Sequence, residues 1–238
     1  MNVFITGTGR ETALGFCFVR RYLEQGDHVI ATVRKPSEAL EKLAEKWPGK
    51  LDILTIDIGN TESVKAAAEK TAELVPCIDL IINNAVVTSP DYKAGSSFED
   101  TTLDYIPDMM NVSAVGPMRV IQALEPLLYK SEGTAMVANI TSGNGSITDC
   151  RTDRQFDYFM SKCALNMGTK ILYNKYLPEK KVRMLCINPG WMRTNPGNEK
   201  APFDPYDQAE RMRLIFEDRR EKFDGVVFVD YDNKEFPW

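Results

Sequence analysis

The stretch Asn2-Val3-Phe4-Ile5-Thr6-Gly7-Thr8-Gly9-Arg10-Glu11-Thr12-Ala13-Leu14-Gly15 decides the fold of this chain. Residues 2–6 predict a strand, and a stretch with helical periodicity follows at 12–25. The small residues between them let the backbone approach a ligand closely, and the helix N-terminus offers N–H groups and a positive dipole end to an anion. Strand, glycine-rich turn and helix in this order favour a site for the pyrophosphate of a dinucleotide over an ordinary turn.

The rest of the chain repeats this alternation of strand and helix. Short apolar runs predict strands at 2–6, 28–33, 51–56, 78–82, 134–140, 182–187 and 225–229. Stretches with helical periodicity predict helices at 12–25, 37–46, 61–74, 102–129, 157–177 and 205–220. Nearly continuous apolar strands that alternate with helices are typical of a parallel sheet covered on both faces. We therefore expect an α/β fold with a Rossmann-type doubly wound parallel sheet, formed by residues 1–238 as a single domain, with its ligand at the carboxyl ends of the strands.

Composition excludes several classes of protein. The formal net charge of −5 argues against a nucleic-acid-binding surface, which needs a basic face. No apolar run reaches the roughly 18–20 residues of a membrane span. The five cysteines are scattered without CxxC spacing, and His28 is the only histidine, so we expect no metal site. Reduced thiols and the absence of a secretory leader predict a cytoplasmic protein.

The second predicted strand ends in Arg34-Lys35, where a domain that binds NAD usually carries an acidic residue. An arginine offers a planar fork of donors that suits a 2′-phosphate, and Arg10 is placed to reach the same group. One charge-assisted hydrogen bond is worth roughly 1.5–3 kcal/mol, or about ten- to a hundredfold in affinity. The sequence therefore predicts NADP(H), the alternative being a solvated charge pair. The expected cofactor-binding residues are Gly7, Gly9, Arg10, Ala13, Leu14, Gly15, Arg34, Asp57, Ile58, Asn84 and Ala85.

Candidate catalytic residues cluster late in the chain. Tyr158 and Lys162 are four residues apart in a predicted helix and so share one face. A phenol titrates near pH 10, and a neighbouring ammonium lowers its pKa by roughly one to three units, toward the range of an effective general acid. Ser142 follows the fifth predicted strand and is placed to orient a substrate oxygen, or to cap a loop. Asn111 lies in the long predicted helix, either to hold a water beside Lys162 or to pack as a structural amide.

Together these motifs resemble the short-chain dehydrogenase/reductase family over essentially the whole chain. The matching features are Thr6-Gly7 with Ala13 and Gly15, Asn83-Asn84-Ala85, Asn111, Ser142, Tyr158-x-x-x-Lys162 and Asn188-Pro189-Gly190. The resemblance implies a catalytic tetrad of Asn111, Ser142, Tyr158 and Lys162. It also implies that Tyr158 and Lys162 contact the cofactor and that Pro189, Gly190, Met192 and Thr194 hold the nicotinamide. The chain departs from the family pattern in a glycine loop two residues longer than usual and in Val86, where the family has glycine.

Within the family, the segments Ser142-Gly143-Asn144-Gly145-Ser146-Ile147 and Pro189-Gly190-Trp191 and the ending from Val229 to Trp238 look like the C-factor and sniffer-type carbonyl reductases. That branch implies an NADPH-dependent reductase of an aldehyde, ketone or quinone, with Tyr158 as the proton donor. A cofactor-binding sensor with little turnover and an NAD-dependent alcohol dehydrogenase are the alternatives. Relatives often pair through the helices at 102–129 and 157–177, which implies a homodimer, while compact members of the branch are monomers. The expected pocket residues are Tyr92, Cys150, Trp191 and Phe203, with Phe98, Arg151 and Tyr206 as further candidates.

Overall fold

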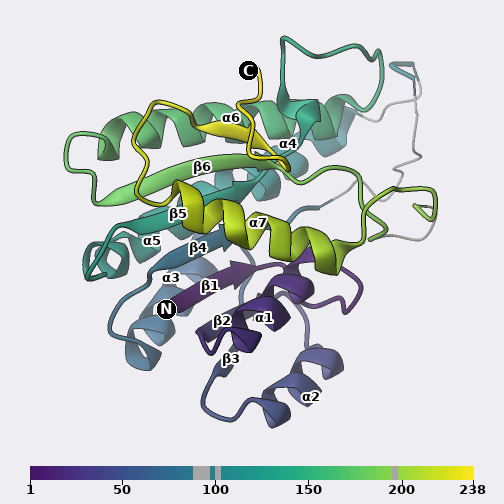
Figure 1. Cartoon of the computed structure of the whole chain (residues 1–238). Helices are drawn as coiled ribbons and strands as arrows, with labels where there is room; N and C mark the ends of the chain where they lie inside the picture. Colours follow the sequence, from purple (N-terminus) through teal and green to yellow (C-terminus); the bar gives the residue numbers. More distant parts are fainter. Residues whose placement is uncertain (88–96, 100–102, 195–197) are drawn as a thin grey trace.

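The computed structural model describes residues 1–87, 97–99, 103–194 and 198–238, and within them seven strands form one parallel sheet (Figure 1). The order across the sheet is β3-β2-β1-β4-β5-β6-β7. The predicted Rossmann-type sheet is thereby confirmed, with every strand end at most three residues from the one expected. The strands are β1 (Asn2–Thr6), β2 (His28–Val33), β3 (Leu51–Thr55), β4 (Leu80–Asn83), β5 (Ala135–Ile140), β6 (Val182–Asn188) and β7 (Phe228–Asp230).

Helices cover both faces of the sheet, which explains why the central strands are apolar on both sides. One face packs against α1 (Leu14–Glu24), α2 (Glu38–Lys46) and α7 (Pro205–Arg219), and the other against α3 (Thr61–Leu74), α5 (Gly116–Tyr129) and α6 (Phe156–Tyr176). All six residues of β5 are buried, as a strand enclosed between two helical layers requires.

Strands β1 and β4 pair directly and in parallel, and they mark the point at which the order of strand addition across the sheet reverses. The first three strands progress from β1 to one edge of the sheet, and β4 to β7 progress to the other edge. Helices α1 and α5, which follow these two strands along the chain, pack on opposite faces of the sheet. We call the region at the carboxyl ends of β1 and β4 the crevice. Ligands of doubly wound sheets bind at this switch point.

The predicted helix at 102–129 is not one α-helix. A 3₁₀ turn at Leu103–Tyr105 leads into α4 (Ile106–Met110), and a π-helical turn at Asn111–Val115 separates α4 from α5. In that turn the N–H of Gly116 donates to the carbonyl of Asn111, five residues earlier. Pro117 has no N–H to continue the α-helical ladder, which favours the wider turn. Such turns are frequent at functional sites.

Candidate active site

The glycine-rich turn after β1 is locked against the end of β4. Gly7 has a φ of 74°, and a Cβ there would lie 2.7 Å from the Cα of Ala85. A Cβ on Gly15 would lie 2.4 Å from the carbonyl oxygen of Gly7. The side-chain amide of Asn84 donates to the carbonyls of Thr6 and Gly7, each at 3.1 Å. Glycine is therefore required at both positions, and Asn84 and Ala85 act here as supports of the turn.

The first turn of α1 faces the same crevice without a side-chain cap. Ala13 is the N-cap residue, its side chain makes no capping hydrogen bond, and α1 starts at Leu14 with Gly15 next. The leading N–H groups of a helix have no partner within the helix and carry its positive dipole end. An uncapped helix start beside a glycine turn is a site that fits the pyrophosphate of a dinucleotide.

A rim of basic side chains borders this turn. Gly9 lies close to the end of β2, because a Cβ on it would be 3.4 Å from the side chain of Val33. Arg10 follows Gly9 and Arg34 follows Val33, so the two arginines lie near each other at one edge of the crevice. Both are exposed. The hydroxyl of Ser37 donates to the carbonyl of Gly9 at 2.8 Å and ties the turn to the start of α2. Arg10 and Arg34, which we call the basic rim, are the two residues expected from the sequence to bind the 2′-phosphate.

Asp57 and Ile58 follow β3 and differ in character. Asp57 is exposed, and its carboxylate accepts the N–H of Gly59 at 2.9 Å. Ile58 is buried, and a Cβ on Gly116 would lie 2.9 Å from its Cδ1. The side chain of Ile58 therefore belongs to the packing between this loop and α5, and its carbonyl accepts from Arg119 at 3.3 Å.

Lys162 is 3% exposed and lies one turn after Tyr158 on α6. Its ammonium donates to the carbonyl of Ile140, the last residue of β5, at 2.8 Å and lies 5.6 Å from the centre of the Tyr158 ring. Burial removes water from the charged form and lowers the pKa of Lys162 to about 8, against a weaker raising influence of Cys186. A positive charge is therefore held beside the phenol at neutral pH.

The backbone of Tyr158 is fixed at the start of α6. Its N–H donates to the carboxylate of Asp157 at 2.8 Å, and its carbonyl accepts the hydroxyl of Ser161 at 2.8 Å. Gln155, which precedes the helix, has a left-handed backbone with φ 61°. Such a conformation costs free energy in a residue other than glycine and is concentrated at functional sites.

Ser142 lies at the end of β5, on the same edge of the sheet. Its hydroxyl oxygen accepts the N–H of Asn144 at 3.1 Å, so the residue does cap the short turn Gly143–Gly145. A Cβ on Gly145 would lie 2.9 Å from the carbonyl carbon of Lys162, so this turn is pressed onto α6. The Ser142 oxygen is the acceptor in this bond, so the capping interaction does not use the hydroxyl proton.

The side chain of Asn111 is engaged at both ends. Its amide donates to the carbonyl of Gly59 at 3.0 Å, and its oxygen accepts from Arg119 at 2.7 Å. Arg119 also donates to the carbonyl of Asn111 at 3.1 Å. These contacts anchor the π-helical turn to the loop after β3, as a structural amide does. A water held between Asn111 and Lys162 stays a prediction.

The loop after β6 is also held from several sides. The N–H of Gly190 donates to the side chain of Asn188 at 3.2 Å, and Gln208 of α7 donates to the carbonyl of Pro189 at 2.6 Å. The backbone of Met192 pairs with that of Phe203, and the N–H of Thr194 donates to the carbonyl of Met192 at 2.9 Å. These contacts hold the backbone of the loop from Pro189 to Thr194 in place.

The expected pocket residues occupy different places. Trp191 is 54% exposed, and Cys150 is exposed on the loop that precedes α6. Phe203 packs instead on Gly190 and on the ring of Tyr231, with ring centres 4.8 Å apart, and so supports the loop after β6. Tyr206 lies over the guanidinium of Arg21 on α1 at 3.4 Å. Tyr92 is outside the described residues.

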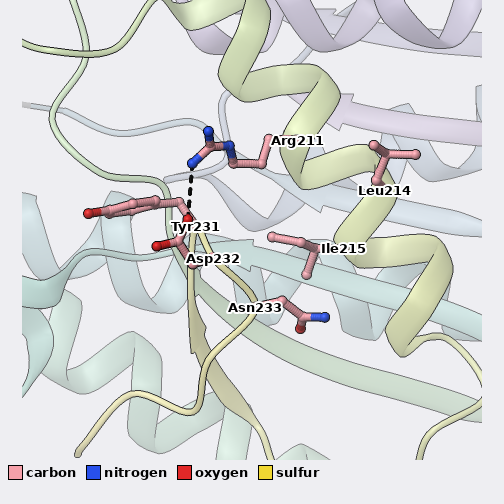
Figure 2. Close-up of a pocket in the computed structure, with 6 residues that line it drawn as sticks. All are labelled: Arg211, Leu214, Ile215, Tyr231, Asp232 and Asn233. Carbon is pink, nitrogen blue, oxygen red and sulfur yellow. Dashed lines mark hydrogen bonds and ion pairs between the residues drawn. The ribbon is translucent and has the colours of Figure 1, made fainter.

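Other kinds of site find no support within the described part of the chain. Its helices include none with the length and apolarity that a membrane crossing demands. No group of three His, Cys, Asp or Glu side chains is arranged to hold a metal in these segments. A hollow of about 300 Å³ lies between α7 and the turn after β7, and none of the candidate catalytic residues lines it. Figure 2 shows the side chains around it. The hollow is lined by Arg211, Leu214, Ile215, Tyr231, Asp232 and Asn233.

A doubly wound sheet with a glycine cradle at its switch point and a buried lysine beside a tyrosine at the same edge defines an oxidoreductase of the dinucleotide-binding class. The family described as short chain dehydrogenase matches residues 2–204. The chain therefore belongs to the short-chain dehydrogenase/reductase family, as the sequence motifs predicted.

Relatives within the family include proteins of the expected branch. C-signal of Myxococcus xanthus is 32% identical over 164 residues, which are 68% of this chain and 93% of that protein. The NADPH-bound carbonyl reductase from chicken fatty liver is 29% identical with a TM-score of 0.88, and covers 100% of this chain and 98% of its own. Carbonyl reductase Sniffer of D. melanogaster is 25% identical with a TM-score of 0.89, over 100% and 99% of the two chains.

Proposed function

We propose that this protein is an NADPH-dependent reductase that transfers a hydride to the carbonyl group of an aldehyde, ketone or quinone. The observation that carries the proposal is the buried ammonium of Lys162 beside the ring of Tyr158, at the sheet edge where the glycine cradle also opens. The similarity to an NADPH-bound carbonyl reductase over the full chain supports the same reaction.

The proposed roles follow from the positions of the residues. When bound, the nicotinamide supplies the hydride that reduces the carbonyl carbon. Tyr158 gives the proton that the carbonyl oxygen needs, and Ser142 donates a hydrogen bond to that oxygen and orients it. Lys162 places its positive charge beside the phenol, where it stabilises the phenolate that remains after proton transfer, and it contacts the ribose. Asn111 holds the π-helical turn that packs against α6.

The cofactor is held, in this proposal, by the cradle and the basic rim. Gly7, Gly9, Ala13, Leu14 and Gly15 give the pyrophosphate close access to the start of α1. Arg10 and Arg34 take the 2′-phosphate. The adenosine and nicotinamide ends contact Asp57, Ile58, Asn84, Ala85, Pro189, Gly190, Met192 and Thr194.

The first test follows the oxidation of NADPH by the purified protein with a panel of aldehydes, ketones and quinones. Turnover with several of them supports the reductase. Tight binding of NADPH without turnover across the panel would favour the sensor, and faster reduction of NAD⁺ by alcohols would favour the alcohol dehydrogenase.

Arg34→Ala is expected to weaken binding of NADPH by about ten- to a hundredfold and to leave binding of NADH within about twofold, because only NADPH carries the 2′-phosphate. Titration of cofactor fluorescence measures both dissociation constants. Lys46→Ala, an exposed cation at the far end of α2, is the matched control. A native preference for NADH would contradict the choice of cofactor.

We also propose that the protein forms a homodimer in the cytoplasm through an apolar stripe on α6. Met160, Met167 and Ile171 are 47%, 62% and 59% exposed and recur at helical spacing on one side of the helix. An exposed apolar stripe of this kind is typical of an interface.

Met167→Glu combined with Ile171→Glu is expected to weaken the dimer by at least about tenfold, since two charges would be buried without partners. Sedimentation velocity across a range of protein concentrations measures the change. Leu214→Glu, a 51% exposed position on α7 at the opposite face, is the control and should leave the dimer intact. A native protein that sediments as a monomer at every concentration would contradict the proposal.

A further inference from the structure

The segment that follows β7, residues 231–238, turns back on that strand, and we call it the tail. The backbone of Val229 pairs antiparallel with that of Glu235. The N–H of Phe236 donates to the carbonyl of Phe228 at 2.9 Å. The rings of Phe236 and Trp238 both pack on Phe228, with centres 5.0 and 5.6 Å apart. The tail is thus part of the folded sheet edge.

The base of the tail is fastened to α7. Arg211 pairs with Asp232 at 3.1 Å, the contact drawn as a dashed line in Figure 2. Arg219 donates to the side-chain oxygen of Asn233 at 2.6 Å, and the amide of Asn233 donates to Asp218 at 2.8 Å. Contacts on both sides of the turn hold its position against the helix.

Tyr231, at the start of the tail, packs on the loop after β6. A Cβ on Gly190 would lie 2.9 Å from Cδ1 of Tyr231 and 2.8 Å from the ring of Phe203. Gly190 also has a φ of 77°, so the backbone there is shaped to accept two aromatic rings. This is the loop to which the proposed function assigns the nicotinamide.

Phe236 and Trp238, at the other end of the tail, hold the loop after β5. A Cβ on Gly143, the residue after Ser142, would lie 3.3 Å from Cζ of Phe236. The carbonyl of Trp238 accepts the N–H of Thr148 at 2.7 Å. The tail therefore contacts the loop between β5 and α6 at two points, beside Ser142 and at Thr148.

We propose that Tyr231 and Phe236 are positioning residues, and that the tail sets the distance between the Ser142 hydroxyl and the Gly190 loop by holding both with aromatic rings. This inference rests on the proposed function, which gives Ser142 the carbonyl oxygen and Gly190 the nicotinamide. Neither ring touches the reacting atoms in this arrangement. A displacement of about 1 Å at a reacting centre can cost a hundredfold in rate, so the spacing between the two loops matters to turnover.

Substitutions at the two ends of the tail are expected to lower different quantities, kcat at one end and the affinity for NADPH at the other. Phe236→Ala releases the Ser142 loop, so kcat should fall by about tenfold or more while the dissociation constant of NADPH stays within about twofold. Tyr231→Ala releases the Gly190 loop, so the affinity for NADPH should fall by about fivefold or more, with a smaller change in kcat at saturation. Phe236→Leu, which keeps apolar bulk over Gly143, should recover most of the kcat.

The control is Phe223→Ala. Phe223 is half-buried and lies 6.0 Å from the guanidinium of Arg183, near the start of β6 and far from the catalytic edge. It should lower stability without a selective change in either kcat or NADPH affinity. Equal kinetic losses in Phe223→Ala and Phe236→Ala would overturn the positioning role, because they would reflect general loosening of the fold.

A second measurement needs no turnover. Hydrogen exchange of the Thr148 amide, which the Trp238 carbonyl protects, should become at least about tenfold faster in Phe236→Ala and stay unchanged in Phe223→Ala. Folded Phe236→Ala with native exchange at Thr148 and native kcat would overturn the inference. A native protein that reduces no carbonyl would contradict the proposed function alone, and the exchange and NADPH measurements would still decide whether the tail holds the two loops.

Discussion

Tyr158→Phe is expected to lower the turnover of carbonyl substrates by about 10²–10⁴-fold, the contribution of a positioned general acid. Phenylalanine keeps the ring and loses only the hydroxyl, so NADPH affinity should stay within about threefold of native. Single-turnover kinetics of NADPH oxidation, with cofactor binding measured separately, distinguish the two effects.

The matched control is Tyr176→Phe on the same helix. The Tyr176 hydroxyl donates to Glu125 at 2.7 Å, and its ring is buried in the core far along α6 from the catalytic edge. This change also removes one phenol hydroxyl, but it should leave turnover within about twofold, because that hydroxyl makes no contact with the reacting groups in the transition state. Native turnover in Tyr158→Phe would exclude Tyr158 as the proton donor.

Lys162→Met is expected to change activity and stability in opposite directions. Turnover should fall by at least about a hundredfold, because the charge that tunes the Tyr158 phenol is lost. The free energy of unfolding at pH 7 should rise, because the native state no longer buries an ammonium. The lowering of its pKa from 10.5 to about 8 corresponds to a cost of roughly 3 kcal/mol. The unpaired Ile140 carbonyl offsets about 1 kcal/mol of the gain.

The difference in the free energy of unfolding between Lys162→Met and the native protein is also expected to depend on pH. Between about pH 8 and pH 10.5, Lys162 is neutral in the folded protein and still protonated in the unfolded chain. The unfolded state then binds more protons, so this group makes the native protein more stable as the pH rises through that window. The stability advantage of Lys162→Met should therefore be full below pH 8 and disappear by pH 10.5. Denaturant titrations of both proteins measure the difference, in which the other titrating groups cancel. A constant difference across the window would contradict the buried-charge explanation.

The sheet could be predicted from the sequence because its signals are local. A continuous apolar run such as residues 135–138 is short enough for a strand, and it is recognised without knowledge of its neighbours. The glycine turn after residues 2–6 and the spacing of Tyr158 and Lys162 also lie within single elements. The doubly wound arrangement was expected from the alternation of elements, because crossovers between parallel strands have a fixed hand.

The parts that could not be predicted depend on contacts between distant segments. The π-helical turn at Asn111 is stabilised by Arg119 and Gly59, and Gly59 lies on another loop. Phe203 packs on Tyr231 and Tyr206 on Arg21, contacts that the sequence could not predict, and a role of either residue in the pocket stays a prediction. The ending from Val229 to Trp238 resembles the sniffer-type branch in sequence, but the contacts of the tail with Gly143 and Gly190 could not be predicted, because only the fold brings these residues near it. Pro117, directly after Gly116, is a local sign in the sequence that the long helix is interrupted.

The pairing of the tail with β7 has a consequence for aggregation at high protein concentration. A parallel sheet that stops at a bare strand exposes a row of unpaired backbone groups, to which a strand from another molecule can add. Here β7 is only three residues long, and its outer side is covered by the backbone around Glu235. The exposed side chains of this covering turn include Asp232, Lys234 and Glu235, whose charges disfavour stacking of a further chain. The fold thus protects itself at this border from edge-to-edge aggregation.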